Sequence, residues 1–147
     1  MFIDQLSNAG SLPAIKAAMR FASQRQKLIA HNIANFETPN FIPKDVSTQK
    51  FQQALAEAVG QRRQQTGGMH GELIIKRTKE VKQGPGGSLT LTPRTPIDGV
   101  LAHDKNTSNL EKTMQDLVEN AVMFRLAADL YKSRSTTIKN AISERAS

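Results

Sequence analysis

The C-terminal third of the chain carries a heptad pattern, and no other feature of the sequence restricts the fold as strongly. From Leu110 to Ile142, seam positions alternate in steps of four and three for about four and a half heptads, and only Ser135 among them is polar. The positions are Leu110, Met114, Leu117, Ala121, Phe124, Ala128, Tyr131, Ser135, Ile138 and Ile142. This spacing predicts a long helix with a coiled-coil seam, beginning at a Ser108–Glu111 capping box.

A second apolar row runs beside this seam. It recurs at four-residue spacing and consists of Val118, Val122, Leu126 and Leu130. Seam and row together make an apolar face wider than one coiled-coil partner covers. A hairpin with a single other helix would leave much of that face in water, so we expect other chains to bury it.

An N-terminal helix is predicted from about Ser11 to Asn35. Its apolar positions follow a three-four alternation interrupted only by Gln26, and they are Leu12, Ile15, Met19, Ala22, Ile29 and Ile33. Ser11 can cap the first amides, and Pro13 fits the first turn, where its missing N–H costs nothing. Thr38-Pro39 disfavours continuation of the helix.

The segment between these helices is polar and rich in glycine. Residues 61–68 and 83–87 read as a spacer and a turn, and they flank residues 72–82, whose pattern is β-like but alternates poorly. Residues 51–59 can form a short helix. We therefore expect a mainly α fold, in which long N- and C-terminal helices pair as a coiled-coil-like hairpin around a small irregular or β-containing middle segment. We divide the chain into three segments, residues 1–40, 41–103 and 104–147. Together they form one functional unit.

The composition limits the size of the hydrophobic core, and the apolar pattern bears on a signal peptide or a membrane span. An apolar fraction of 38% and an aromatic fraction of 5% predict a thin core, supplied mainly by the two ends, with little to bury in the middle. Cysteine is absent, which excludes disulfides and thiolate metal sites. The N-terminus lacks a basic region and a long apolar region, and no stretch approaches the roughly 20 apolar residues of a membrane span. We expect neither a cleaved signal peptide nor a membrane anchor.

No catalytic or metal-binding pattern stands out. His31, His70 and His103 lie in separate segments, and none has a second ligand at i+3 or i+4. Motifs for a nucleophile elbow, a phosphate-binding loop or a zinc protease are absent. We expect no enzyme activity, no cofactor, no metal and no small-molecule substrate.

The middle segment is basic within a chain of formal net charge +7. Its cations are Arg62, Arg63, Lys76, Arg77, Lys79 and Lys82, set against Glu72 and Glu80. The best functional interpretation of this run is binding to a phosphate backbone, and the interpretation without a function is a solvated charged loop. No aromatic residue lies between Gln52 and Phe124 on which a base could stack, so nucleic-acid binding is disfavoured. The alternative function is a soluble helical adaptor that binds nucleic acid or anionic surfaces through this middle.

The end of the N-terminal helix resembles the signature of flagellar axial proteins. Residues 25–41 read RQKLIAHNIANFETPNF. Asn32 and Asn35 form an Asn-x-x-Asn pair, and Thr38, Pro39 and Phe41 belong to the Thr-Pro-Gly/Asn-aromatic turn that follows. The two amides can hydrogen-bond the last helix carbonyls or a neighbour's backbone, while Pro39 enforces an extended exit.

A second segment is similar to the start of the C-terminal helix in flagellar rod proteins. Residues 104–114 read DKNTSNLEKTM, where the family has Asp-Gly-Asn-x-Val-Asp-Leu-Glu-x-Glu-Met, and residues 119–124 read ENAVMF, where it has Asn-Ala-x-x-Tyr. The departures are Lys105, Ser108, Asn109, Thr113 and Phe124. The short middle fits proximal rod proteins of the FlgB type better than hook or distal rod proteins, which carry larger inserted domains.

This resemblance implies a structural subunit of the bacterial flagellar basal-body rod, the drive shaft for motility. Such a subunit assembles with its own copies and other rod proteins through the apolar positions of both terminal helices. The implied partners also include the membrane ring, the rod adaptor and the flagellar type III export apparatus. The implied location is the periplasmic rod, reached without a cleaved signal peptide.

Overall fold

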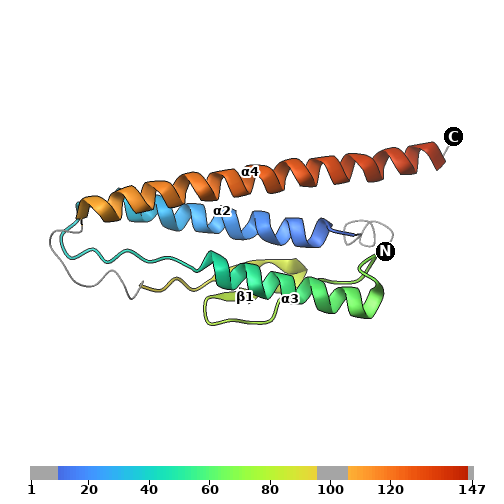
Figure 1. Cartoon of the computed structure of the whole chain (residues 1–147), viewed down its shortest axis with the longest axis horizontal. Coiled ribbons are helices and arrows are strands. Elements are labelled where there is room, and N and C mark those ends of the chain that lie inside the picture. The colour runs from blue at the N-terminus through green and yellow to red at the C-terminus, as the bar shows by residue number, and fades with distance from the viewer. Residues whose placement is uncertain (1–9, 96–105, 146–147) are drawn as a thin grey trace.

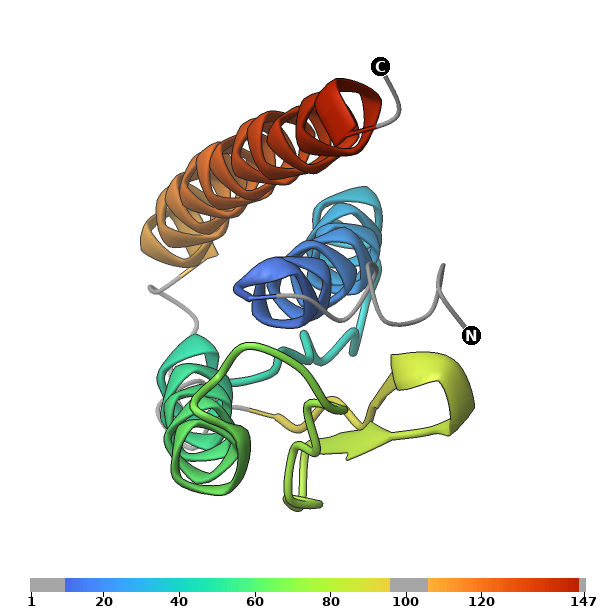
Figure 2. The same cartoon turned by 90° about the vertical axis from the view of Figure 1, so that its right-hand side faces the viewer.

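The computed structural model describes residues 10–95 and 106–145, and the architecture is three helices with a small hairpin. In chain order the elements are α2 (Leu12–Ala34), α3 (Thr48–Thr66), β1 (Val81–Gln83), the 3-10 turn η1 (Pro85–Gly87), β2 (Leu89–Leu91) and α4 (Asn106–Arg145). α4 lies antiparallel along α2, and α3 and the hairpin lie on the other side of α2 (Figures 1 and 2). The predicted fold class, with two long helices near the ends of the chain and a β-containing middle, is confirmed.

The ends of α2 agree with the predicted boundaries. Pro13 lies in the first turn, and Asn35 is the C-cap, where its backbone N–H donates to the His31 carbonyl while the Phe36 N–H donates to the Ile33 carbonyl. Ser11 occupies the N-cap position, but its side chain makes no capping hydrogen bond, so the prediction that it caps the first amides is wrong. Its backbone there is already helical, with ψ of −7°, rather than in the extended conformation typical of a capping serine.

Helix α3 is longer than the residue pattern indicates. It continues through residues 61–66, which the sequence presents as part of a spacer, and that prediction is wrong. Gln and Arg are good helix formers, so a polar stretch can extend a helix once it has begun. The Ser47 hydroxyl accepts from the Lys50 amide at the start, and Gly67, at φ +65°, ends the helix in the left-handed conformation.

The β1–β2 hairpin is antiparallel and uses the glycine-rich turn that the sequence indicates. Its register pairs Val81 with Leu91, Lys82 with Thr90, and Gln83 with Leu89. Residues 84–88 form the connection, which includes η1. At Gly87, φ is +70°, in the left-handed region that glycine adopts without strain, so the conformation of this turn favours glycine.

The middle of the chain supplies most of the hydrophobic core, so the expectation that it has little to bury is wrong. Ala17 and Phe21 of α2 pack against a cluster drawn from later segments, and the Phe21 and Phe51 rings stack with centroids 3.9 Å apart. The later members are Val46, Phe51, Ala54, Ala58, Leu73, Ile75, Val81 and Leu89. Each element contributes only a few of these residues, and the short runs carry little periodicity that could reveal their burial.

Helix α4 begins at Asn106, two residues before the predicted start, which places Ser108 within the first turn. The side chains of residues 106–109 lie outside the described part of the chain, and so does the predicted capping hydrogen bond. At 40 residues, α4 far exceeds the 23 residues of α2, and its C-terminal end projects past α2 (Figure 1). The Lys16 ammonium lies 5.8 Å from the centre of the Tyr131 ring, so the last 14 residues, about 21 Å of helix, lie beyond this contact.

Candidate assembly surface

One continuous apolar row on α4 faces away from α2. Its side chains are large and substantially exposed: Met114 at 42%, Val118 at 62%, Val122 at 61%, Leu126 at 59% and Leu130 at 46%. They recur every four residues, so they form a single ridge along the helix. We call these five residues the α4 outer row. Isolated exposed apolar residues are ordinary, but a contiguous ridge of them is typical of a surface that another molecule covers.

The predicted heptad seam of α4 lies at the edge of its contact with α2. Within the chain, Leu110, Leu117, Ala128, Tyr131 and Ile138 are half-buried, whereas Met114, Ala121, Phe124 and Ile142 are exposed. The most buried positions of α4 are Asn120 and Ala127, one residue before Ala121 and Ala128. A polar and a small residue thus occupy the most buried positions of α4, and the larger apolar side chains of the seam lie beside them.

The predicted positions on α2 are more deeply packed. Leu12, Ala22 and Ile29 are buried, and Ile15, Met19 and Ile33 are half-buried. α2 lies between α4 on one side and α3 with the hairpin on the other, so most of its circumference is covered within one chain (Figure 2). Among the residues that the structure describes, α4 has neighbours on one side only (Figure 2).

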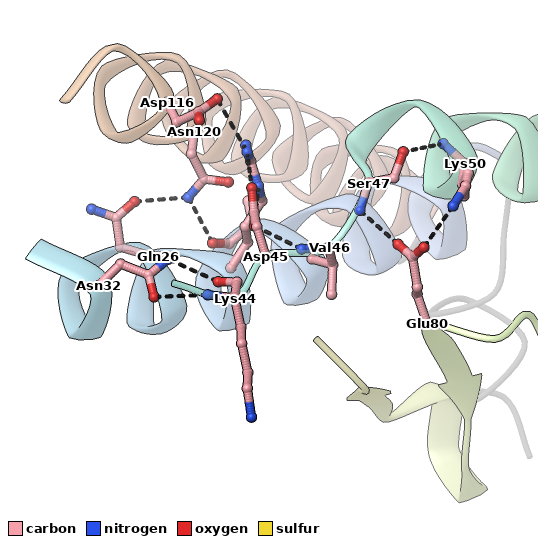
Figure 3. Close-up of polar contacts among 12 residues, drawn as sticks. Gln26, Asn32, Lys44, Asp45, Val46, Ser47, Lys50, Glu80, Asp116 and Asn120 are labelled. Atoms are coloured by element: carbon pink, nitrogen blue, oxygen red, sulfur yellow. Dashed lines mark hydrogen bonds and ion pairs between the residues drawn. The ribbon is translucent and has the colours of Figure 1, made fainter. Parts of the chain in front are cut away.

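Asn120 fixes the two long helices relative to each other. It is 1% exposed, and its amide nitrogen donates to the Ala22 carbonyl oxygen at 2.8 Å and to Gln26 Oε1 at 2.7 Å (Figure 3). Its side-chain oxygen has no hydrogen-bond partner within the described residues. A buried amide in an apolar helix contact favours one register, because a shifted register would leave it unpaired.

The buried Arg25 joins three segments through ion pairs with two half-buried carboxylates. Its Nε and one terminal nitrogen donate to the two Asp45 carboxylate oxygens at 3.1 and 2.7 Å, and the same terminal nitrogen donates to Asp116 Oδ1 at 3.2 Å. Burial lowers the pKa of the Arg25 guanidinium, but the hydrogen bonds and charges of Asp45 and Asp116 outweigh it and hold that pKa above its ordinary value. These ion pairs tie α2 to α4 and to the segment that leaves α2.

The signature turn is held by its two asparagines in different ways. Asn32 is buried, and its side chain donates to the Lys44 carbonyl and accepts from the Lys44 amide (Figure 3). Asn35 donates to the His31 carbonyl, one of the last carbonyls of α2, as predicted. Asn40 has φ of +60°, which explains why Gly or Asn suits this place in the turn.

The remaining signature residues lie at the surface. Thr38 and Pro39 are exposed, and Phe41 is half-buried with its ring edge-on to His31 at 5.7 Å. The turn therefore presents its apex to solvent while Asn32 anchors its exit.

Arg62 does not belong to a solvated basic surface, and the prediction that it lies on the exterior is wrong. Its side chain is buried, and it donates to the Gly71 and Gly10 carbonyl oxygens. Burial lowers the pKa of the Arg62 guanidinium. The helix continues to Thr66, which turns Arg62 inward on the same face as Ala58. The basic middle thus has one free cation fewer than its sequence suggests.

The described residues hold no group of three or more His, Asp or Glu side chains that could bind a metal ion. His31 and His70 are exposed, and His103 lies outside the described residues. None of the helices described here is both long and apolar enough to span a membrane.

The sequence comparison agrees with the resemblance. The chain is similar to a flagellar rod protein. It is 24% identical over 138 residues to the flagellar basal body rod protein FlgB of Salmonella typhimurium (strain LT2), covering 89% of this chain and 96% of that protein. No family model matches the chain. The similarity to FlgB spans nearly the whole of both chains, which includes the middle segment that carries neither signature.

The structural roles of two residues within the signature segments could not be predicted from residue type. Arg25 and Asn120 both lie within the matched segments, yet they look like solvent-facing positions of an amphipathic helix. The spacing of residues on α4 could have indicated that Asn120 faces α2. Asp116, Asn120, Met123 and Ala127 follow a 4-3-4 spacing parallel to the predicted seam, and the two polar members of this row hydrogen-bond to α2.

Proposed function

We propose that this chain is a structural subunit of the bacterial flagellar basal-body rod that self-assembles through its terminal helices and is not an enzyme. The observation that carries the proposal is the α4 outer row, which stays exposed after the chain has folded. Similarity to FlgB across both chains supports the same role. The terminal segments, residues 1–40 and 104–147, would act as one assembly unit, and α3 and the hairpin of the middle segment, residues 41–103, lie on the far side of α2 (Figure 2).

The energetics favour contacts with several neighbours at once. Completing the burial of five half-exposed apolar side chains contributes on the order of 5 kcal/mol. Association costs roughly 4–15 kcal/mol in lost freedom of motion, so one such contact would be weak. A subunit in a helical tube touches several copies, and non-closing contacts between unlike surfaces generate such a tube. Weak contacts between two subunits are therefore compatible with a stable polymer.

The partners follow from the same role. They are copies of this chain, other rod proteins, and the membrane ring and rod adaptor of the basal body. Delivery would use the flagellar type III export apparatus without a cleaved signal peptide, and the assembled position is the periplasmic part of the rod. There the subunit contributes to the drive shaft for motility.

Deletion of the gene tests the proposal in the bacterium that carries it. We expect non-motile cells whose isolated basal bodies lack a complete rod in electron micrographs, and restoration of both by the wild-type gene in trans. Motile deletion cells with normal rods would contradict the proposal. Binding of the purified chain to DNA at physiological salt, together with normal rods, would instead favour the adaptor function.

A further inference from the structure

The hairpin carries a basic hollow that the assembly role does not use. Arg77, Thr78, Lys79, Val81, Lys82, Thr90, Thr92 and Arg94 line it. Its charged members are two arginines and two lysines, and all four are exposed. We call this set of residues the basic hollow. It lies on the hairpin, which α2 separates from α4, so a ligand there would leave the α4 outer row accessible (Figure 2).

The single carboxylate within this stretch, Glu80, forms its hydrogen bonds with residues outside the hollow, and of the four cations only Arg94 contributes to lowering its pKa. Glu80 is 6% exposed, and its two oxygens accept from the Lys50 ammonium and the Ser47 amide, both at 2.7 Å (Figure 3). Within residues 10–95 and 106–145, none of Arg77, Lys79, Lys82 and Arg94 forms an ion pair. The fold thus neutralises Lys50 with Glu80 and leaves four like charges around one depression.

Four unpaired cations around a depression repel one another, and an anion placed among them relieves that repulsion. The strands help to position the charges. Lys82 pairs with Thr90 across the hairpin, and the Thr92 amide donates to the Glu80 carbonyl, so two exposed threonines, on β2 and directly after it, lie beside the cations. Hydroxyls, guanidinium groups and ammonium groups are all donors to carboxylate oxygens.

The character of the lining selects among anionic partners. It contains no aromatic side chain on which a nucleic-acid base could stack, and its one apolar member, Val81, is buried and cannot anchor in a lipid surface. Duplex DNA is typically held by about 6–10 phosphate contacts along an extended surface, more than four cations in one depression provide. A short run of carboxylates on a protein matches the size and the chemistry of the lining.

We propose that the basic hollow binds a short acidic segment of a protein partner. The contact is independent of the α4 outer row, and it gives the subunit a second surface with a different chemistry. Binding weakens with rising salt, because the four cations are exposed and screened.

The test uses the full-length chain and a fluorescently labelled hexaglutamate peptide, with binding followed by fluorescence anisotropy. The hollow variant is Lys79→Gln with Lys82→Gln. The control variant is Lys132→Gln with Lys139→Gln, which removes the same charge from exposed positions on α4. We expect the wild type and the control to bind alike and the hollow variant to bind about tenfold more weakly.

Three outcomes would overturn the proposal. The first is no binding of hexaglutamate by the wild type at low salt. The second is an equal loss in both variants, which would show attraction to net charge alone. The third is stronger binding to an oligothymidylate of equal charge, or to vesicles containing an anionic phospholipid, when the hollow variant abolishes that binding. Circular dichroism of each variant checks that the substitutions leave the fold intact.

Discussion

At the scale of single residues, the pairing of α2 and α4 depends most directly on the Asn120 amide. This group is buried and donates two hydrogen bonds across the helix contact. The Ala22 carbonyl oxygen and Gln26 Oε1 both accept from this amide nitrogen. This pair of donated hydrogen bonds distinguishes the amide from side chains of similar size.

Two substitutions at Asn120 separate the hydrogen-bond donor from the volume. Asn120→Ala removes the donor and should lower the free energy of unfolding by about 1–2 kcal/mol. Asn120→Asp keeps the volume but sets a buried carboxylate against two acceptors, and it should cost about 3–5 kcal/mol at neutral pH. Urea denaturation monitored by circular dichroism measures both.

The Asp variant should regain stability in acid. The pKa of its buried carboxyl would be raised above the ordinary value, because burial and the facing acceptors disfavour the charged form. Its penalty is therefore largest above that raised pKa and shrinks as the pH falls through it. If the Asp and Ala variants lose equal stability at neutral pH, the amide does not donate as described.

At the scale of elements, Glu80 holds the hairpin to the start of α3. Its carboxylate binds the Ser47 amide and the Lys50 ammonium (Figure 3). Burial raises the pKa of Glu80, but the hydrogen bonds from Lys50 and Ser47 and the charges of Lys50 and Arg94 outweigh it and lower that pKa below its ordinary value of 4.5. Glu80 thus links two elements with a strength that depends on pH.

The sign of this linkage fixes a testable pH dependence. A carboxyl with a lowered pKa in the folded state stabilises the fold above its unfolded-state pKa, and this contribution disappears as the pH falls from about 4.5 through the lower folded-state value. Glu80→Gln should therefore cost about 1 kcal/mol at neutral pH and have little effect in strong acid. Glu57→Gln, an exposed change on α3, is the control. Equal acid sensitivity of wild type and Glu80→Gln would contradict this role.

The sequence predicts elements where the signal is long or chemically specific. The two long helices, the exit turn after Asn35 and the glycine-rich hairpin turn follow from periodicity and turn chemistry, and the structure contains them. The end of α3 and the buried Arg62 were missed, because polar residues in a helix and in a loop look alike without their neighbours. The core in the middle was missed for a related reason. Leu73, Ile75 and Val81 become a cluster only when the chain brings them to Phe21 and Phe51.

The exposed and buried faces of α4 were predicted only in part. The row through Val118 and Val122 was expected to lie outside a two-helix contact, and both residues are exposed in the folded chain. The seam was assigned by its larger apolar residues, whereas Asn120 and Ala127 are the most buried positions of α4. Heptad spacing gives the face of a helix to within one residue, and the size of the side chains at the contact decides the rest.

At the scale of the whole molecule, the chain is asymmetric in how it uses its long helices. α2 is enclosed between two layers, while α4 is covered on one side and projects beyond α2 at its C-terminal end (Figures 1 and 2). A monomer of this shape has a folded body and one helix, α4, with an exposed apolar row. Assembly of copies along α4 is the central claim, and Val122 is the position that tests it with least disturbance to the monomer.

The decisive measurement is the yield of Val122→Asp subunits in isolated basal bodies at matched expression. Val122 is 61% exposed, so the variant monomer should retain its stability to within about 0.5 kcal/mol, unlike a charge at the half-buried Leu117. Ala56→Asp on α3 adds the same charge at another exposed helical position and serves as the control. An unpaired charge in a packed subunit contact costs several kcal/mol, so incorporation of Val122→Asp should fall at least about tenfold while Ala56→Asp incorporates normally. Equal incorporation of the two variants would contradict assembly through the α4 outer row.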